Sequence, residues 1–500
     1  MIAERAELHK ALDAGRGEIE RLERIIAALK QKIFGTGQSE KVDHEQLTIE
    51  LNLAEIELEQ LQVERVLKGL PADDADEKKP EPKKREKQVR RYAFPEHMEV
   101  VTETILPQAV QDEPDAYREV GKPEVTELLD VRPMQFIKRR IVRPRFVRID
   151  DRAAAPLVAP TPPRVLSGGL PGTELLVLVI LSKYMDHLPL YRQAQIFASR
   201  YQVELNRKIL GNWIRAVAED WLSIIYHSIK SDLQKETFLH ADETPITCLD
   251  PDDQRGSRKG YLWGYVDGQG NCLYDWHMSR SKKAAAFMLC GYRGLLQADA
   301  YGVYQSLSAE EGFLLIACIA HVRRKFHEAW DQANQRAAGW YILHIAKLYK
   351  VERRIKQTQA DKVTMRIQHS LPILNQIKLR LEQDEQLLPK RSKTYEAVRY
   401  MLNVWPNLQR YIYYTQANID NNPAEQAVRC TKLGMKNWLF IGHPKAGKRA
   451  AIIYTIVQNC KNHGLDPRAY LIDVLKRLPR MNNNTAAIRA LQPRFWKPEN

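Results

Sequence analysis

The chain has few cysteines, no long apolar run and no leader-like start, and each absence narrows its function. Its six cysteines include no Cys-x-x-Cys pair, which argues against a disulfide framework and against a cysteine zinc site. The longest apolar stretches, residues 175–181 and 313–320, are too short to span a membrane. The first residues lack the basic-then-apolar pattern of a signal peptide. We therefore expect a cytoplasmic protein without a membrane partner.

Negative charge is also in short supply, because 76 Lys and Arg face 62 Asp and Glu, a net charge of +14. Such a surplus suits a polyanionic partner, and nucleic acid is the first candidate. A merely basic soluble protein is the alternative, since charge alone identifies no site. A length of 500 residues with 44% hydrophobic content is enough for several cores, and the patterns below predict a multidomain α+β chain.

Residues 1–70 carry the spacing of coiled-coil helices. Leu22, Ile26, Leu29 and Ile33 alternate steps of four and three, which is the seam of a coiled coil. A second periodic run follows, after glycines that break the first. We favour self-association into a homo-oligomer, and a helical hairpin within one chain is the alternative. Residues 71–92 are charged and contain prolines, which predicts a disordered linker.

Residues 93–150 predict a small basic β module. The stretches 125–131 and 135–149 are rich in Val, Ile and Arg and are interpreted as short strands. Arg139 and Arg140 lie within the second stretch and are candidates for DNA contact. Residues 151–172 are rich in Pro and Gly, which indicates a second linker.

Residues 173–232 predict a helical region that resembles a helix-turn-helix. Its second helix, near residues 206–215, would then lie against DNA with Arg207, Lys208 and Arg215 as contacts. A small helical core without DNA has the same spacing, so this alternative stays open.

Strands dominate from residue 233 and give way to helices later. Residues 233–327 contain three strands and then strands that alternate with helices, which indicates a mixed α/β sheet. Residues 328–415 have the pattern of long charged helices and look like an insertion. Residues 416–480 return as helices that complete the sheet domain, and residues 481–500 are expected to be a loose tail.

Three carboxylates carry the candidate chemistry. Asp242 and Asp299 each follow buried strand residues, and Glu425 lies at the start of a helix marked by Asn422 and Pro423. Acids at neighbouring strand ends, completed by a helix glutamate, can converge on one point. Hard divalent cations prefer such oxygen ligands, and two cations there can activate water or a 3′-hydroxyl against a phosphodiester.

Each of these acids also has an ordinary structural alternative. Asp242 could be a turn residue at a strand end, and its neighbour Glu243 could be mistaken for it. Asp299 could cap a following helix. Glu425 could fold back onto the helix start as the acid of a capping box. The order of two strand aspartates and one helix glutamate is much less expected by chance than any one of the three alone.

Basic residues surround these acids in the sequence. Arg323 and Arg324, with His321, follow an apolar strand and are candidates for phosphate contact, with structural ion pairs as the alternative. A zinc site through His321 and His327 lacks a third ligand at suitable spacing, so no zinc is expected. Three further bases follow Glu425 and could hold the DNA backbone: Arg429, Lys432 and Lys436.

Several long motifs resemble the bacterial transposases of the insertion sequence 66 family. The residues that carry this resemblance are 29–43, 240–246, 296–304, 320–329, 420–429, 435–447 and 462–475. Their length and order are far more specific than a single short pattern.

The resemblance implies an RNase H-like catalytic domain with a DDE triad, in which Asp242, Asp299 and Glu425 hold two Mg²⁺ ions, or Mn²⁺ in their place. It implies cleavage of transposon ends in double-stranded DNA and attack of the freed 3′-hydroxyl on target DNA, by a bacterial, nucleoid-associated protein. Members of this family typically act with small accessory proteins of the same element. They also usually carry a cysteine zinc finger before the catalytic domain, and residues 93–150 contain no cysteine.

Two rival functions remain at this stage. One is a catalytically inactive, transposase-derived DNA-binding protein, in which the three acids would lie apart. The other is a structural protein organised by its coiled coil, which the basic charge and the strand-end acids argue against.

Overall fold

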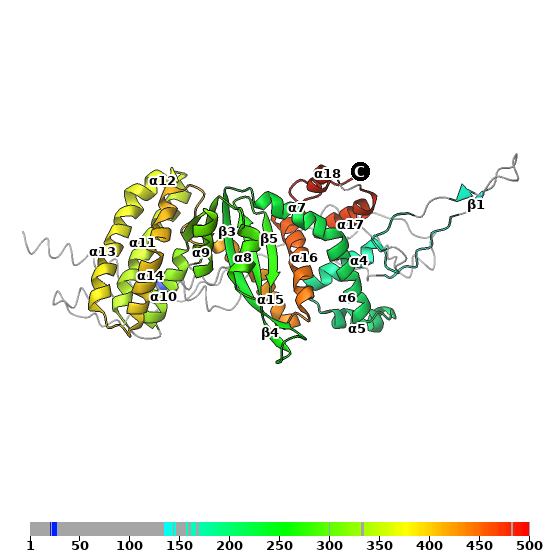
Figure 1. Cartoon of the computed structure of the whole chain (residues 1–500), viewed down its shortest axis with the longest axis horizontal. Helices are drawn as coiled ribbons and strands as arrows, with labels where there is room; N and C mark the ends of the chain where they lie inside the picture. Colours follow the sequence, from blue (N-terminus) through cyan, green and yellow to red (C-terminus); the bar gives the residue numbers. More distant parts are fainter. Residues whose placement is uncertain are drawn as a thin grey trace, which may run out of the picture. The chain divides into compact units, whose positions relative to one another are not determined.

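The structure is a computed structural model (Figure 1). The residues that it describes are 21, 23–27, 135–143, 145–146, 157–158, 162–166, 170–299, 301–331, 335–481 and 484–499. Residues 21 and 23–27 are helical, and Ile26 is buried while Ile25 is exposed; the coiled coil itself stays a prediction. The rest of the coiled-coil prediction, the linker 71–92 and the strand 125–131 lie outside the described residues.

The predicted strand over residues 135–149 is wrong for most of its length. Residues 135–143 have no regular secondary structure, and among the described residues of this stretch only β1 (Arg145–Phe146) is a strand. It pairs antiparallel with β2 (Leu157–Val158), which lies in the predicted linker. Alternation predicts a strand only where one face packs, and here Ile137 is 80% exposed.

The helical region contains the predicted pair of helices and the turn between them. Asn206 begins the second helix, because its side chain accepts the backbone N–H groups of Lys208 and Ile209 at 3.1 and 3.0 Å. Gln202, in a left-handed conformation, ends the first. The elements are α4 (Thr173–Tyr184), α5 (Leu190–Tyr201), α6 (Arg207–Ala216), the π-helical segment η2 (Val217–Leu222) and α7 (Ser223–Leu233).

A five-stranded mixed sheet forms the centre of the following region, as predicted. The strand order is β5-β4-β3-β6-β7; the first three strands are antiparallel, and β3, β6 and β7 are parallel. The strands are β3 (Phe238–Leu249), β4 (Ser257–Asp267), β5 (Cys272–His277), β6 (Leu295–Ala298) and β7 (Leu314–Ala317).

Helices cover both faces of this sheet. Asp242 pairs with Gly264 across β3 and β4, and a Cβ at Gly264 would meet Val428 of α15 (Asn422–Trp438) at 2.9 Å. Successive strand residues alternate between faces, and the ring of Trp263 packs edge-on against Tyr304 of α9 (Gly302–Glu311). One face therefore carries α15 and α16 (Pro444–Asn462), and the other carries α8 (Lys282–Leu289) and α9.

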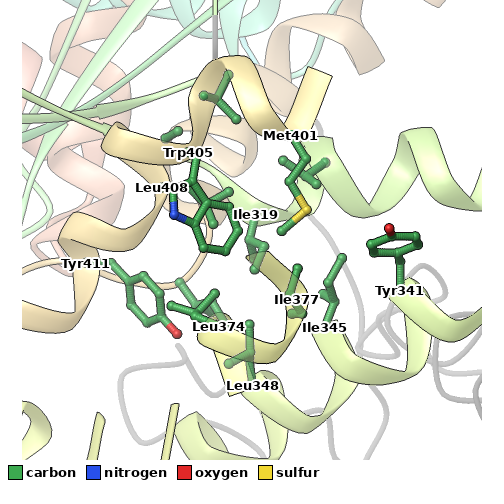
Figure 2. Close-up of a cluster of buried hydrophobic side chains, with 14 of the residues drawn as sticks. Ile319, Tyr341, Ile345, Leu348, Leu374, Ile377, Met401, Trp405, Leu408 and Tyr411 are labelled. Atoms are coloured by element: carbon green, nitrogen blue, oxygen red, sulfur yellow. The ribbon is translucent and has the colours of Figure 1, made fainter. Parts of the chain in front are cut away.

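The long helices predicted for residues 328–415 are present and share one core (Figure 2). Ile345, Leu374 and Met401 from three of these helices are fully buried together, and the core continues to Ile316 of β7. The insertion therefore packs directly against the edge strand of the sheet. The helical segments between β7 and α15 are α10 (Ile319–Asp331), within which the predicted insertion begins, α11 (Ala337–Thr358), α12 (Lys362–Met365), η3 (Arg366–Ser370), α13 (Leu371–Leu387), α14 (Lys393–Leu408) and η4 (Gln409–Tyr413).

The prediction of a loose tail after residue 480 is wrong for residues 484–499. Leu491 is fully buried, and Arg489 and Arg494 both pair with Asp232 of α7. These ion pairs and the buried leucine hold the segment on the helical region. The last elements are α17 (Pro467–Arg477), η5 (Leu478–Arg480) and α18 (Thr485–Ala490). Among the described residues, no helix has the length and apolarity to cross a membrane.

Candidate active site

Asp242 lies within β3, on the face of the sheet that α15 covers. Its side chain is partly buried, and its partner Gly264 on β4 leaves room for the close approach of Val428. The prediction placed Asp242 at a strand end, but β3 continues to Leu249. The reason is that β3 is a long strand whose second half extends beyond β6 and is held by β4 and by a bridge to Ile441.

Asp299 follows β6 directly, as predicted. One carboxylate oxygen accepts the backbone N–H of Tyr301 at 3.1 Å, so Asp299 forms a turn just before α9. The other oxygen lies 3.4 Å from the guanidinium of Arg280. Asp299 is therefore held in place by the turn, and its side chain stays partly accessible.

Glu425 lies in the first turn of α15, and its neighbour Asn421 fixes where that helix begins. Asn421, which is fully buried, donates its side-chain amide to the carbonyl of Ala241 at 2.7 Å and accepts from His240 at 2.8 Å. These bonds tie the start of α15 to β3 beside Asp242. The helix therefore begins one residue later than Asn421, and the cap is Asn421, where Asn422 was predicted.

The carboxylate of Glu425 does not form the capping box. Its Oε1 atom is buried and has no hydrogen-bond partner, and Nδ1 of the His321 imidazole lies 3.8 Å from it. An orphaned buried carboxylate oxygen costs free energy unless a cation or a proton satisfies it. This atom is the strongest sign that the site is built for a ligand that bears positive charge.

The acids act on each other electrostatically. Burial, followed by the negative charges of Glu243, Glu425 and Asp299, raises the pKa of Asp242 to about 7. Like charges that disfavour ionisation in this way are a mark of a cation site without its cation. The carboxylates of Asp242, Asp299 and Glu425 are oxygen ligands of the kind that hard divalent cations prefer, but among the described residues these three acids do not form the group whose ligand atoms lie close together.

Glu243 faces the other side of β3, and both of its carboxylate oxygens have hydrogen-bond partners. Arg280 binds one of its oxygens through Nε at 2.6 Å, and the hydroxyl of Tyr304 donates to the other at 2.8 Å. Its side chain is almost completely buried. These partners separate Glu243 from Asp242, a distinction that the sequence left open.

Cys318 is a neighbour of the site that the ligand-spacing argument missed. Its Sγ, a nitrogen of His321 and an oxygen of Glu425 all lie within 4.8 Å of one another. However, burial raises the pKa of the Cys318 thiol to about 12, and this sulfur already accepts the N–H of Asn421 at 3.2 Å. A protonated, hydrogen-bonded thiol is a poor metal ligand. We therefore interpret Cys318 as a packing neighbour of Glu425 and not as a zinc ligand.

Comparison with known proteins identifies the family. A family profile described as "Transposase IS66 family" matches residues 168–449, which is more than half of the chain. A second profile, described as "Transposase C of IS166 homeodomain", matches residues 21–102. The chain belongs to the IS66 transposase family. The resemblance drawn from the motifs is therefore confirmed.

Two relatives of this chain come from Sinorhizobium fredii (strain NBRC 101917 / NGR234). "Uncharacterized protein y4jD" is 31% identical over 390 residues, which cover 75% of each chain. "Uncharacterized protein y4qI" is 28% identical over 517 residues, which cover 99% of this chain and 93% of the relative. The likeness to y4qI thus extends over almost the whole transposase chain.

Most of the basic residues predicted for DNA contact in this transposase are exposed. Arg323 is the exception, because it is only 7% exposed and its Nε has no hydrogen-bond partner. It therefore presents little of its side chain to a phosphate. The exposed candidates are Arg139, Arg140, Arg207, Lys208, Arg215, Arg324, Arg429, Lys432 and Lys436.

Several residues around the candidate site were not predicted from the sequence. Asn421 was visible as one of two adjacent asparagines, but nothing in the sequence told which one enters the core. Cys318 precedes His321 by three residues, a spacing that places both on one turn of a helix. Asp420 accepts the side-chain amide of Asn422 at 3.1 Å. Tyr304 ends the motif 296–304, but its contact with Glu243 was not predicted, and Arg280 comes from a segment without a recognisable motif.

Proposed function

We propose that this chain is a DNA transposase that cleaves the ends of its element and joins them to target DNA. Asp242, Asp299 and Glu425 are the catalytic acids of this proposal. The observation that carries it is the buried, unpartnered oxygen of Glu425 on the same face of the sheet as Asp242, in a chain of a transposase family. The strand order with three antiparallel strands followed by two parallel ones is in keeping with an RNase H-like domain.

The three acids would hold divalent cations, Mg²⁺ or Mn²⁺, which supply a polarised water or 3′-hydroxyl and stabilise the leaving oxygen. Asp242 and Glu425 approach from β3 and α15, and Asn421 keeps these two elements in register. Arg280, anchored by Glu243, holds Asp299. His321 stays neutral near pH 7, because burial lowers its pKa, and it adds no charge that would compete with a cation.

DNA would lie along the exposed basic side chains next to this site. Arg429, Lys432 and Lys436 fall on one face of α15 at spacings of three and four. The helix α6, with Arg207, Lys208 and Arg215, would provide a second contact in the manner of a helix-turn-helix. Oligomerisation through the N-terminal coiled coil and cooperation with accessory proteins of the same element complete the proposal.

An inactive DNA-binding relative is the second candidate function. Two observations favour it: Arg280 reaches the carboxylate of Asp299 at 3.4 Å, and among the described residues the close ligand group consists of Cys318, His321 and Glu425 rather than the three acids. In that case, the protein would have no cleavage activity to lose, and substitution of the three acids would leave DNA binding unchanged.

Cleavage mapping separates the two candidates. The full chain is incubated with duplexes of its element's terminal repeats and Mg²⁺, and nicks are mapped on a denaturing gel. We expect nicks at the element boundary that disappear with Asp242→Asn and persist with Asp253→Asn, an acid in the β3–β4 turn that bonds only to Arg255 among the described side chains. Binding of these duplexes without any Mg²⁺-dependent nick would favour the inactive relative.

A further inference from the structure

A pocket lies beside the C-terminal end of α15, on the same face of the sheet as Asp242. It is a small cavity of about 70 Å³ that opens to solvent. It is bordered by α4, β3, β4, α16 and the segment that follows α15. The lining residues are Lys183, Tyr184, Ile246, Leu262, Trp438 and Phe440, and the wall is completed by Ile441 and Gly442 before α16 and by Ala446, Ala450 and Tyr454 of α16.

The chemistry of this pocket is aromatic with one positive charge. Phe440 is 43% exposed, and Trp438 and Tyr184 supply further aromatic wall. The ammonium of Lys183 lies 5.5 Å from the ring centroid of Tyr184 and has no ion-pair partner among the described residues. Burial lowers the pKa of this amine. Flat rings beside a lone cationic donor suit a ligand that is planar and rich in hydrogen-bond acceptors.

Strain is stored at the rim of this pocket. Leu439 has a φ of 62°, a left-handed conformation that is an outlier for a bulky residue, and its side chain is 66% exposed. The strain persists because Ile441 is fastened to β3, where its N–H donates to the carbonyl of Thr247 at 2.9 Å. The strained turn at Leu439 costs free energy, and it places Phe440 at the mouth of the pocket.

A basic track leads from the catalytic acid to this pocket. Arg429, Lys432 and Lys436 occupy one exposed face of α15 between Glu425 and Trp438. At 1.5 Å per residue, Trp438 lies about 20 Å along the helix from Glu425, and Ile246 lies about 13 Å along β3 from Asp242. These distances correspond to roughly four to six base steps along one DNA strand.

We propose that the pocket lined by Trp438, Phe440 and Lys183 receives a single unpaired base of the bound DNA, about four to six nucleotides from the cleaved bond. This inference rests on the proposed function, because the DNA must follow α15. The base stacks against Phe440 and Trp438, and Lys183 donates to its ring or carbonyl acceptors. Removal of a base from the duplex costs a few kcal/mol, and stacking of the base on aromatic rings offsets this cost.

A protein side chain from a second copy is the alternative occupant. The basic track and the lone ammonium argue for the polyanion, since an apolar side chain would leave Lys183 without a partner. The two occupants predict different effects of removing Phe440. If a DNA base occupies the pocket, the environment of that base changes; if a side chain of a second copy occupies it, the number of chains per particle changes.

The test uses the full chain and terminal-repeat duplexes that carry one 2-aminopurine at positions three to seven from the cleaved bond. This base analogue is dim while stacked in a duplex and brightens when it leaves the stack. An end label reports affinity by anisotropy in the same samples. Two variants probe the pocket: Phe440→Ala removes a stacking ring, and Ala446→Met fills the space. Phe495→Ala is the matched control, because Phe495 is 42% exposed and lies beside Arg489, away from the pocket.

We expect one position to brighten with the unaltered chain and with Phe495→Ala, and to lose at least half of that signal with Phe440→Ala and Ala446→Met. The affinity should fall about fivefold or more with Phe440→Ala.

DNA binding without a bright position, or with one that both pocket variants preserve, would overturn the pocket and leave the proposed function intact. A change in chains per particle by light scattering, without a change in fluorescence, would assign the pocket to a protein partner and also overturn it. No binding of terminal-repeat DNA by the unaltered chain would remove the proposed function itself.

Discussion

Asp242 and Glu243 are adjacent on β3, yet the two faces of this strand treat their carboxylates in opposite ways. Glu243 is bound by Arg280 and by the hydroxyl of Tyr304, so both of its oxygens have partners. On the face of Asp242, an oxygen of Glu425 is buried without one, and neighbouring negative charge adds to burial in raising the pKa of Asp242.

The difference shows how a structural acid can be told from a candidate catalytic one. A buried carboxylate whose lone pairs are all used stabilises the fold, and removal of its partners is destabilising. A group of carboxylates that repel one another lowers stability, and such an arrangement is expected where a ligand provides the missing positive charge. The following predictions test whether the two faces of β3 divide these tasks.

The largest expected effect belongs to Asp242→Asn. Removal of this charge should lower the rate of Mg²⁺-dependent nicking of terminal-repeat DNA about a thousandfold or more, because a metal ligand supplies several kcal/mol of transition-state stabilisation. The dissociation constant for the same DNA, measured by anisotropy, should stay within about threefold. An equal loss of affinity and of nicking would mean that Asp242 serves the fold or the DNA contact.

Asn421→Ala tests the link between the two elements that carry the acids. The variant loses the bonds to Ala241 and His240, so α15 can shift relative to β3. We expect nicking to slow about 10- to 100-fold, as for residues that orient metal ligands, with unchanged affinity for DNA. Asn422→Ala is the control, because this neighbour is exposed and bonds only to Asp420 among the described side chains. Equal rates for the two variants would remove Asn421 from the positioning role.

Glu243→Gln should act on stability before chemistry. The substitution breaks the ion pair with Arg280, whose side chain is 37% exposed, so solvent screening limits the cost to about 2 kcal/mol. The unfolding temperature, followed by circular dichroism, should fall by about 3 to 8 °C. Folded protein should nick DNA within about tenfold of the unaltered chain. A loss of nicking as large as that of Asp242→Asn, with no change in unfolding temperature, would move Glu243 into the active site.

The smallest expected effect is the dependence of Mg²⁺ stabilisation on pH. The pKa of Asp242 is raised from 3.8 to about 7 in the folded chain, so its ionisation costs stability as pH rises through that range. Bound Mg²⁺ would replace the proton. We expect Mg²⁺ to raise the unfolding temperature by a few degrees at pH 8 and by less at pH 5.5. Asp242→Asn should reduce this difference, and a Mg²⁺ effect independent of both pH and Asp242 would contradict it.

Much of the fold was accessible from the sequence, because strands and helices here have strong patterns. The mixed sheet, the helices of the insertion and the helix–turn–helix pair follow from apolar periodicity and from caps such as Asn206. The strand prediction failed for residues 135–143, because the side chains of Ile137 and Ile141 are exposed and are not packed against a second layer. The tail failed because its buried Leu491 and its ion pairs to Asp232 depend on contacts across more than 250 residues.

The candidate site was predictable in its acids and not in their environment. Asp242, Asp299 and Glu425 stand in recognisable motifs. The pattern around each one also predicted its element: a strand for Asp242, a strand end for Asp299 and a helix start for Glu425. The sequence could not tell which face of β3 is reactive, since alternation gives two faces without naming their neighbours. Only the packing of Arg280 and Tyr304 against Glu243, and of α15 against Asp242, separates them.

The most direct test of the central claim is metal binding by the acids themselves. Mn²⁺ is titrated into the full chain bound to terminal-repeat DNA, and bound ions are counted by electron paramagnetic resonance. We predict that the unaltered chain and Asp253→Asn retain Mn²⁺, whereas Asp242→Asn and Glu425→Gln each lose at least one ion per chain. Equal Mn²⁺ binding by all four proteins would contradict the assignment of Asp242 and Glu425 as metal ligands.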